Sequence, residues 1–171
     1  MADFLLRPWH RRDASSLYRY AHNRKIADML KDDFPYPYTY EDAKAFVSQC
    51  MQAEGKDRHY LAIDVGAKAV GSIGVKVGKD IYKKSAQIGF WLGEEFWGQE
   101  IMTGAIKTIC EQAFEMFDIA RIEGRVFANN PGARRALEKA GFTLEGVLRK
   151  SVYKNGYLFD CLLLARLKDG E

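Results

Sequence analysis

The stretch of residues 89–103, GFWLGEEFWGQEIMT, joins an apolar, strand-like run to an amphipathic helix. The first turn of a helix leaves four backbone N–H groups without intrahelical partners and carries a partial positive charge. A strand, a turn with a small residue and a helix therefore predict a seat for a phosphate or pyrophosphate group. The stretch contains neither G-x-G-x-x-G nor G-x-x-x-x-G-K-[ST]. Hydride transfer and nucleotide hydrolysis therefore lose their main sequence support.

Cysteine chemistry finds no such support. The three cysteines, Cys50, Cys110 and Cys161, match neither a redox CxxC motif nor a zinc-binding spacing. The first two lie in apolar patterns with helical spacing, and the third lies in strand-like alternation. We therefore expect three core thiols and predict neither a cysteine nucleophile nor a metal site.

The composition is that of one globular domain, which we assign to residues 1–171. The chain has 26 Lys+Arg against 23 Asp+Glu, a formal charge of +3, and 47% hydrophobic residues. Basic and acidic residues are interleaved, which favours no nucleic-acid partner. No window approaches the roughly 18 consecutive apolar residues of a membrane span, and the first residues lack a secretory signal. We predict a cytoplasmic protein that does not contact a membrane.

Hydrophobic periodicity predicts the elements that must position the 89–103 stretch. The expected strands are residues 4–7, 60–65, 70–77, 86–92, 121–127, 142–153 and 157–167, the last two joined by an Asn155-Gly156 turn. The expected helices are one or two within residues 12–30, then residues 39–54, 103–117 and 131–139. We expect Asp13 and Thr39 to be N-caps, Asn23 to break the first helical run and Gly141 to end the last helix.

The element order predicts the sheet. The strand at 86–92, the helix at 103–117 and the strand at 121–127 form a crossover unit, which makes those two strands parallel. The flanking hairpins are antiparallel. We therefore expect an α/β fold of mixed α+β order, with a mostly antiparallel sheet, a central parallel strand pair and flanking helices.

Four segments carry a family resemblance that spans nearly the whole chain. They are LRPWHRRDASSLYRYA (6–21), FPYPYTYEDA (34–43), IGFWLGEEFWGQEIMTGA (88–105), and ANNPGARRALEKAGFTLEGVLR (128–149) followed by YKNGYLFD (153–160). In this order they resemble the GNAT acetyltransferases, in particular the branch of ribosomal-protein N-terminal acetyltransferases (RimJ/RimL-like). The resemblance implies a single GNAT domain that binds acetyl-CoA between two splayed parallel strands, residues 86–92 and 121–127.

The family's pyrophosphate loop falls on the turn before the 103–117 helix. The residues it implies for cofactor binding are Trp97, Gly98, Gln99, Glu100, Ile101, Met102 and Thr103. Gly98 and Thr103 fit the family pattern, but Glu100 stands where the family has glycine and Met102 where it has a small residue. A carboxylate beside a pyrophosphate costs Coulomb energy unless it points away.

The resemblance also implies roles for the strand before this loop. Phe90 and Leu92, with Trp91 between them, would pair through the backbone with the pantetheine arm, and an N–H near Leu92 would polarise the thioester carbonyl. The same run fits a buried strand. Asn130 would contact the cofactor arm, although it equally fits an N-cap ahead of a proline, and Arg135 would lie near the 3′-phosphate.

The resemblance does not single out a general acid or a general base. Gln87 stands where many relatives carry a glutamate, and the family's thiolate-donor positions fall on Ala133 and Leu137. The remaining candidates are Tyr153 as acid and Glu94, acting through water, as base. Both also fit ordinary surface residues.

The aromatic loop at 34–40 has two interpretations. By resemblance, Phe34, Tyr36 and Tyr38 line the acceptor pocket. Alternatively, these rings pack around two prolines and only complete the core.

The leading hypothesis is an N-acetyltransferase that moves acetyl from acetyl-CoA to a primary amine by direct attack in a ternary complex. The acceptor is a protein N-terminus or a small-molecule amine, and a homodimer is possible in this family. The alternative is a non-catalytic acyl-CoA-binding or regulatory module, suggested by Glu100, Gln87, Ala133 and Leu137. A nucleic-acid-binding protein would require steep salt dependence, for which the charge pattern offers no reason.

Overall fold

The structure is a computed structural model and describes residues 3–169. The strands in this range are β1 (Leu5–Arg7), β2 (Arg58–Val65), β3 (Lys68–Val77), β4 (Ser85–Leu92), β5 (Arg121–Phe127), β6 (Thr143–Lys154) and β7 (Tyr157–Leu167). The α-helices are α1 (Ala14–Ala21), α2 (Arg24–Ala27), α3 (Tyr40–Ala53), α4 (Ile101–Met116) and α5 (Pro131–Lys139). Short 3-10 turns are η1 (Arg11–Asp13), η2 (Asp80–Tyr82) and η3 (Glu94–Phe96).

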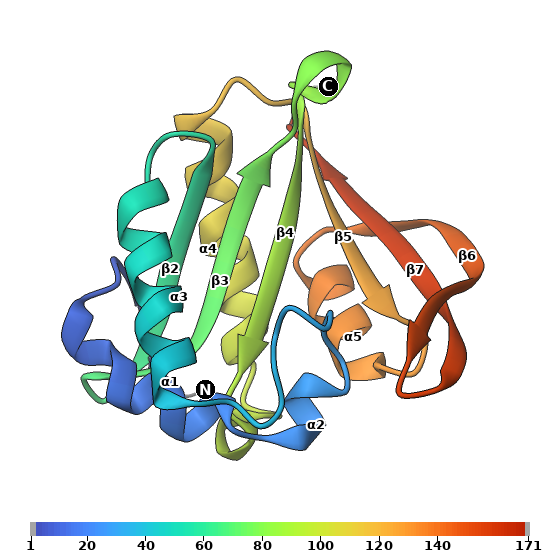
Figure 1. Cartoon of the computed structure of the whole chain (residues 1–171). Helices are drawn as coiled ribbons and strands as arrows, with labels where there is room; N and C mark the ends of the chain where they lie inside the picture. The colour runs from blue at the N-terminus through green and yellow to red at the C-terminus, as the bar shows by residue number, and fades with distance from the viewer. Residues whose placement is uncertain (1–2, 170–171) are drawn as a thin grey trace. The chain divides into compact units, whose positions relative to one another are not determined.

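The strands are hydrogen-bonded in the order β1-β2-β3-β4-β5-β7-β6 (Figure 1). β1 pairs antiparallel with β2, and β7 pairs antiparallel with both β5 and β6. β4 and β5 are parallel, with a register that runs from Ser85↔Arg121 to Ile88↔Gly124. The predicted mixed sheet with a parallel pair around the crossover helix is confirmed.

The described residues form two compact units. Residues 3–74 and 89–101 belong to the first, and residues 75–88 and 102–169 belong to the second. β3 and β4 contribute residues to both units.

In the first unit, α1 packs against α3, α3 contacts β2, and β2 pairs with β1. Its most buried large side chains include Leu17, Val47, Ile63, Val70 and Ile73. α3 begins as predicted, because the Thr39 hydroxyl accepts the Asp42 N–H at 3.1 Å while the Asp42 carboxylate accepts the Thr39 N–H at 2.9 Å. This capping box satisfies two donors at the start of the helix.

Asp13 occupies the predicted N-cap position of α1, but its side chain does not cap the helix, because its carboxylate is engaged by other groups. Asp13 accepts hydrogen bonds from the Arg7 guanidinium at 2.8 and 2.9 Å and from the His10 N–H at 2.8 Å. It makes no side-chain cap to α1. Asp13 instead joins the start of α1 to β1, through its hydrogen bonds with Arg7.

The predicted break at Asn23 is confirmed. The helical run is divided into α1 and α2, and it ends at Ala27, short of the predicted residue 30. Asn23 has extended backbone, and its side-chain oxygen accepts the Lys25 N–H at 2.9 Å, so it is the N-cap of α2. An asparagine that can cap a helix therefore starts a new helix here.

The second unit holds β5, β6, β7, α5 and all of α4 after its first residue. α4 starts at Ile101, earlier than the predicted residue 103, and its predicted apolar stripe buries Ile106, Ile109, Cys110 and Ala113 completely. α5 has the predicted bounds. Asn155 and Gly156 have φ of 52° and 82°, as a tight β6–β7 hairpin requires.

Candidate functional site

The end of β4 is held tightly in the first unit. Trp91 and Leu92 are buried, Phe90 is half-buried, and the Gly93 N–H donates to the Val70 carbonyl at 2.8 Å. A Cβ on Gly71 would lie 2.5 Å from the Trp91 carbonyl oxygen, so only glycine lets the backbones of β3 and β4 approach this closely. Sequence analysis did not single out Gly71, because a close backbone approach leaves no local pattern.

The turn after β4 folds back on the strand. The Trp97 indole N–H donates to the Leu92 carbonyl at 2.8 Å, although the Trp97 side chain is 46% exposed. Phe96 packs edge-on against Tyr20 of α1, with ring centroids 5.6 Å apart. The predicted cofactor residues Leu92 and Trp97 are thus in direct contact.

Two residues in the predicted pyrophosphate loop adopt left-handed backbone. Gly98 has φ of +77° and Glu100 has φ of +63°. The first costs nothing for glycine, whereas a side chain at the second is strained. Position 100 is where the family resemblance led us to expect glycine, and the backbone geometry supplies the physical reason. Ile101 then begins α4, so Met102 and Thr103 lie in its first turn and not in a loop.

The aromatic loop divides between the two predicted interpretations. Tyr38 is a core residue, 4% exposed, and burial together with nearby Asp42 raises its pKa. Phe34 contacts Tyr38 at 5.1 Å and also lies edge-on to Trp91 at 5.6 Å, so it joins the loop to β4. Tyr36 is 48% exposed and stacks on His22. Tyr38 packs as the core interpretation proposed, while Phe34 and Tyr36 keep the acceptor-wall prediction open.

Glu94, the predicted base, lies in η3 and is bound on both carboxylate oxygens. Asn23 Nδ2 donates to Oε1 at 3.0 Å, and Lys25 Nζ donates to Oε2 at 2.7 Å. The hydrogen bonds from Lys25 and Asn23 lower the pKa of Glu94, which keeps it ionised near neutral pH. This polar cluster was not foreseen, since its members lie 69 and 71 residues apart in sequence.

Gln99, in the first unit, donates through Nε2 to the Glu95 carbonyl at 3.2 Å. The predicted residues Asn130, Arg135 and Tyr153 belong to the second unit. Asn130 is the N-cap of α5, where its Oδ1 accepts the Ala133 N–H at 3.3 Å, as one of its two predicted interpretations required. Arg135 is exposed on α5. Tyr153 is 71% exposed near the tip of the β6–β7 hairpin, where it is paired with Leu158. The catalytic role of Tyr153 and the cofactor role of Arg135 stay predictions.

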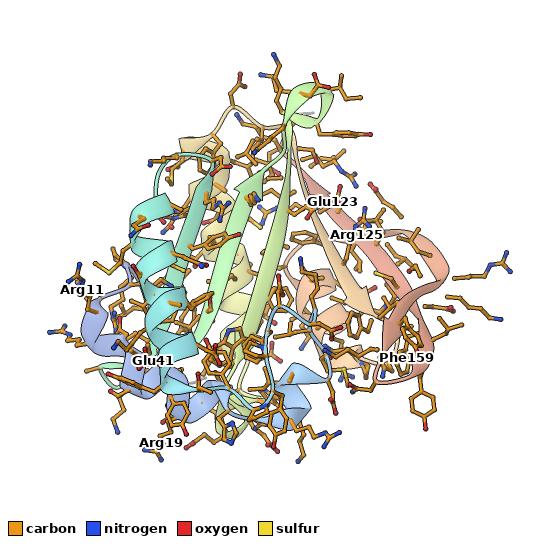
Figure 2. The ribbon with its side chains drawn as sticks, viewed as in Figure 1. Arg11, Arg19, Glu41, Glu123, Arg125 and Phe159 are labelled. Carbon is orange, nitrogen blue, oxygen red and sulfur yellow. The ribbon has the colours of Figure 1, made fainter. Side chains whose placement is uncertain are left out.

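The strand register reveals a carboxylate that sequence analysis missed. Gln87 of β4 is the direct partner of Glu123 of β5. Partners in a sheet point to the same face, so Glu123 lies beside the position where the family resemblance led us to expect a glutamate. Arg125, labelled beside Glu123 in Figure 2, has its Nε 3.3 Å from the Glu123 carboxylate. Arg121 Nη2 lies 3.5 Å from the same carboxylate. The sequence predicted that the two strands are parallel, but it did not predict their register, and only the register identifies Glu123 as the partner of Gln87.

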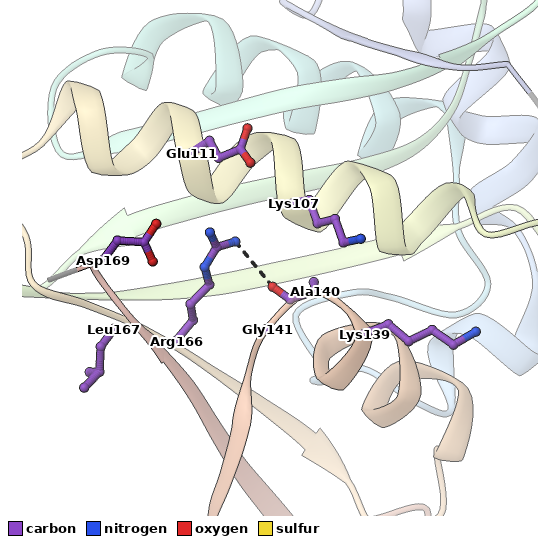
Figure 3. A pocket seen from close by; sticks show the side chains of 8 residues that line it. All are labelled: Lys107, Glu111, Lys139, Ala140, Gly141, Arg166, Leu167 and Asp169. Carbon is purple, nitrogen blue, oxygen red and sulfur yellow. Dashed lines mark hydrogen bonds between the residues drawn. The ribbon is translucent and has the colours of Figure 1, made fainter. Parts of the chain in front are cut away.

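A shallow cavity of about 440 Å³ lies elsewhere in the second unit (Figure 3). Lys107, Lys139 and Arg166 share its lining with Glu111 and Asp169, and Arg166 donates to the Ala140 carbonyl at 3.3 Å. Its charges are mixed, and none of the predicted site residues lines it.

Residues 3–169 contain neither a cluster of metal-binding side chains nor a membrane-spanning helix. Within them, no three His, Cys, Asp or Glu side chains gather as metal ligands would. Nor does this part of the chain contain a helix with the length and apolar character needed to cross a membrane.

Comparisons with known proteins agree with this geometry. Residues 3–143 match the family model described as "Acetyltransferase (GNAT) domain". Over 88 residues the chain is 40% identical to "Probable N-acetyltransferase YjcK" of Bacillus subtilis (strain 168), covering 52% of this chain and 49% of the relative. The chain thus spans about half the length of the curated relatives it matches.

Two solved structures share the fold. RimL, a ribosomal L7/L12 alpha-N-protein acetyltransferase in complex with coenzyme A, superposes with a TM-score of 0.88 at 22% identity, covering 100% of this chain and 97% of its own. The microcin C7 self immunity acetyltransferase MccE, in complex with acetyl-CoA and AMP, gives a TM-score of 0.85 at 24% identity, covering 97% of this chain and 93% of its own.

Proposed function

The chain belongs to the acetyltransferase (GNAT) domain family, and from this premise we propose that it is an N-acetyltransferase that moves an acetyl group from acetyl-CoA to a primary amine. The observation that carries the proposal is the continuous β4–turn–α4 unit, in which a buried strand end is followed by a helix start. That unit supplies backbone donors for a thioester and for a pyrophosphate within one short segment.

The proposed acetyl-CoA contacts follow from this unit. The first-turn N–H groups of α4, including those of Met102 and Thr103, bind the pyrophosphate. The open Gly98 allows close approach, since nothing lies within 4 Å of a Cβ built there. The backbone of Phe90 to Leu92 aligns the pantetheine arm. Asn130 and Arg135 contact the arm and the 3′-phosphate.

The proposed reaction is direct transfer in a ternary complex. The amine nitrogen bonds to the acetyl carbon, the carbon–sulfur bond breaks, the amine loses a proton to a base, and the departing thiolate takes a proton from an acid. An N–H near Leu92 stabilises the oxygen charge that develops. Positioning alone supplies a large part of the rate, because it turns a bimolecular step into an effectively unimolecular one.

Proton transfer has three candidate side chains. Tyr153 is the proposed acid, and Glu94 and Glu123 are the proposed bases. Glu94→Gln and Glu123→Gln separate the two, because loss of the base lowers kcat and removes the acidic limb of its pH profile. If a substitution leaves kcat and its pH profile unchanged, the glutamate that it replaces is not the base.

The remaining proposals concern the chain as a whole. We take residues 1–171 as one acetyltransferase domain, supported by the full-length superposition on RimL. A protein N-terminus is the favoured acceptor, because RimL acts on a ribosomal protein N-terminus. Small-molecule amines are the competing class. A cytoplasmic location and a homodimer stay predictions.

A non-catalytic acyl-CoA-binding module is the second candidate. The carboxylate of Glu100 in a strained loop position favours it. So does Gln87, which stands where the family resemblance led us to expect a glutamate. This candidate predicts acetyl-CoA binding without transfer to any amine. The leading proposal predicts release of CoA when a suitable amine is added.

Thermal unfolding with acetyl-CoA, CoA or ADP tests the proposal first, because a ligand that binds the native state raises the melting temperature. We expect a rise with both CoA species and little change with ADP. Acetyl-CoA is then mixed with an amine panel and free CoA is measured. Absence of a shift with either CoA species would falsify the proposal.

A further inference from the structure

The corner between α1 and α2 sends two adjacent side chains to two different functional segments. α1 ends at Ala21 and α2 begins at Arg24, so His22 and Asn23 form the link. Asn23 contacts the turn after β4, whereas His22 contacts the aromatic loop. We name the turn at residues 93–97 the cofactor-side turn and the loop at residues 34–38 the acceptor-side loop.

Asn23 uses its whole amide group at this corner. Its oxygen accepts the Lys25 N–H, and its NH₂ group donates to Glu94. Lys25 returns to the same carboxylate through Nζ. The cap of α2 and the contacts with the cofactor-side turn therefore form one hydrogen-bond network, in which the Glu94 carboxylate accepts from both side chains. Isolated exposed ion pairs contribute little to stability, but a carboxylate held by two donors is fixed in direction.

His22 serves the acceptor-side loop in a comparable way. Its Nδ1 accepts the Tyr38 N–H at 3.2 Å, so in this bond Nδ1 carries no proton. Its ring stacks on Tyr36 at 5.4 Å and 8°, and on Tyr18 at 6.0 Å and 19°. The Arg24 guanidinium lies 5.8 Å from the centroid of the Tyr36 ring. The loop is thus held through both its backbone and an exposed ring.

We propose that the His22–Asn23 corner is a positioning element that holds the cofactor-side turn and the acceptor-side loop in register with the end of β4. Phe34 of the loop touches Trp91, and the Trp97 indole of the turn touches the Leu92 carbonyl, so both held segments rest on that strand end. The corner residues act through these segments and touch no reacting atom. The functional meaning rests on the proposed acetyl transfer, but the positioning itself does not.

Hydrogen–deuterium exchange of the chain without ligand tests the positioning directly, because local opening of a segment raises its amide exchange. Lys25→Met should raise exchange in residues 93–97 only. His22→Phe, which keeps a ring but loses the acceptor, should raise it in residues 34–38 only, and His22→Asn should restore part of the protection. Asn23→Ala should also raise exchange in residues 93–97, because it removes the hydrogen bond to Glu94. Glu41→Gln is the matched control, since it breaks an exposed Lys44 ion pair within α3.

Binding measurements test the consequence for acetyl-CoA. Lys25→Met and Glu94→Gln should weaken acetyl-CoA about two- to fivefold, while His22→Phe leaves it unchanged and raises KM for octapeptides that begin with Ser, Ala or Met. Because the Lys25 hydrogen bond lowers the pKa of Glu94, Lys25→Met should move the acidic limb of the kcat–pH profile to higher pH if Glu94 is the base. An unaltered profile together with weaker acetyl-CoA binding assigns Lys25 and Glu94 to positioning alone.

The proposal is overturned if Lys25→Met and Asn23→Ala leave exchange in 93–97 at the level of the control. It is also overturned if exchange rises equally across the first unit. A wild-type chain that binds no acetyl-CoA would reject the proposed function alone, since the exchange pattern is read without ligand.

Discussion

Glu100 is the residue at which chemistry and backbone geometry conflict. Its φ of +63° is a left-handed conformation that costs a residue with a side chain about 1 kcal/mol. The preceding left-handed position is Gly98, where no such cost arises. A strained, charged residue at the start of the helix that we propose binds pyrophosphate is expected to weaken acetyl-CoA binding.

Two substitutions separate charge from strain at this position. Glu100→Gln removes the charge alone, whereas Glu100→Gly removes both. We expect both variants to bind acetyl-CoA about two- to fivefold more tightly by isothermal titration, because a negative charge near the pyrophosphate is lost. Tighter binding by the glycine variant alone would assign the penalty to the backbone, and unchanged affinity in both would show that the carboxylate points away.

The cysteines lead to a second residue-scale prediction. Cys50 and Cys110 are 3% and 0% exposed, and burial raises the pKa of each thiol to about 12. Burial also raises the pKa of Cys161. Since the thiolate is the reactive form, we expect negligible labelling of the folded chain by a disulfide reagent at pH 8, and labelling of all three thiols in urea. Rapid labelling of a native thiol would contradict this and reopen a covalent mechanism.

At the scale of elements, α3 depends on its N-cap residue, Thr39, which directly precedes the helix. Its capping box links Thr39 and Asp42 and forms the start of a helix that packs on α1. Thr39→Ala should lower the free energy of unfolding by about 1 kcal/mol in urea, with an unchanged m-value. Thr39→Ser keeps the hydroxyl and should retain most of the stability. Equal losses in the two variants would mean that packing of the threonine methyl group, and not the cap, is responsible.

For β4 and β5, the sequence predicted the strand direction but not the strand register. Periodicity predicted both strands and the helix between them, and the crossover connection predicted that the strands are parallel. The register that sets Gln87 beside Glu123 follows from packing, because a one-residue slip would turn every side chain to the other face. The carboxylate paired with the expected base position was therefore hidden from sequence analysis.

At the scale of the molecule, one ion cluster joins three segments of the first unit. Arg7 of β1 donates to Asp13 at 2.8 Å and to Asp64 of β2 at 2.6 Å, and all three side chains are largely buried. Burial opposes ionisation of Asp13, but the hydrogen bonds from Arg7 and the His10 N–H outweigh it and hold its pKa below the usual value. The cluster is thus an acid-sensitive element of stability.

Acid titration tests this cluster. Because Asp13 has a lower pKa when folded, the unfolded chain binds its proton at higher pH, so stability rises with pH between the two values. The contribution should be complete above about pH 5 and should be lost as pH falls below about 4 through the folded pKa. Asp13→Asn should cost about 3 kcal/mol at pH 7 and flatten this acid dependence. An unchanged pH profile of urea midpoints in the variant would assign the acid sensitivity to other carboxylates.

Local patterns in the sequence determined most of the element order, the Thr39 cap, the Asn23 break, the Asn155-Gly156 hairpin and the three core cysteines. These features depend on residues close together in the chain, where periodicity and turn chemistry act. The Asp13 cap failed for the opposite reason, since a more favourable partner came from β1.

Only the tertiary structure decided which distant groups meet. Asn23 and Lys25 reach Glu94 across 71 and 69 residues, Gly71 lies against the Trp91 backbone, and Glu123 faces Gln87. Each of these contacts depends on strand register or on close packing between separate segments. Such contacts are set by the sum of many weak interactions over the whole fold, so no short stretch of sequence encodes them.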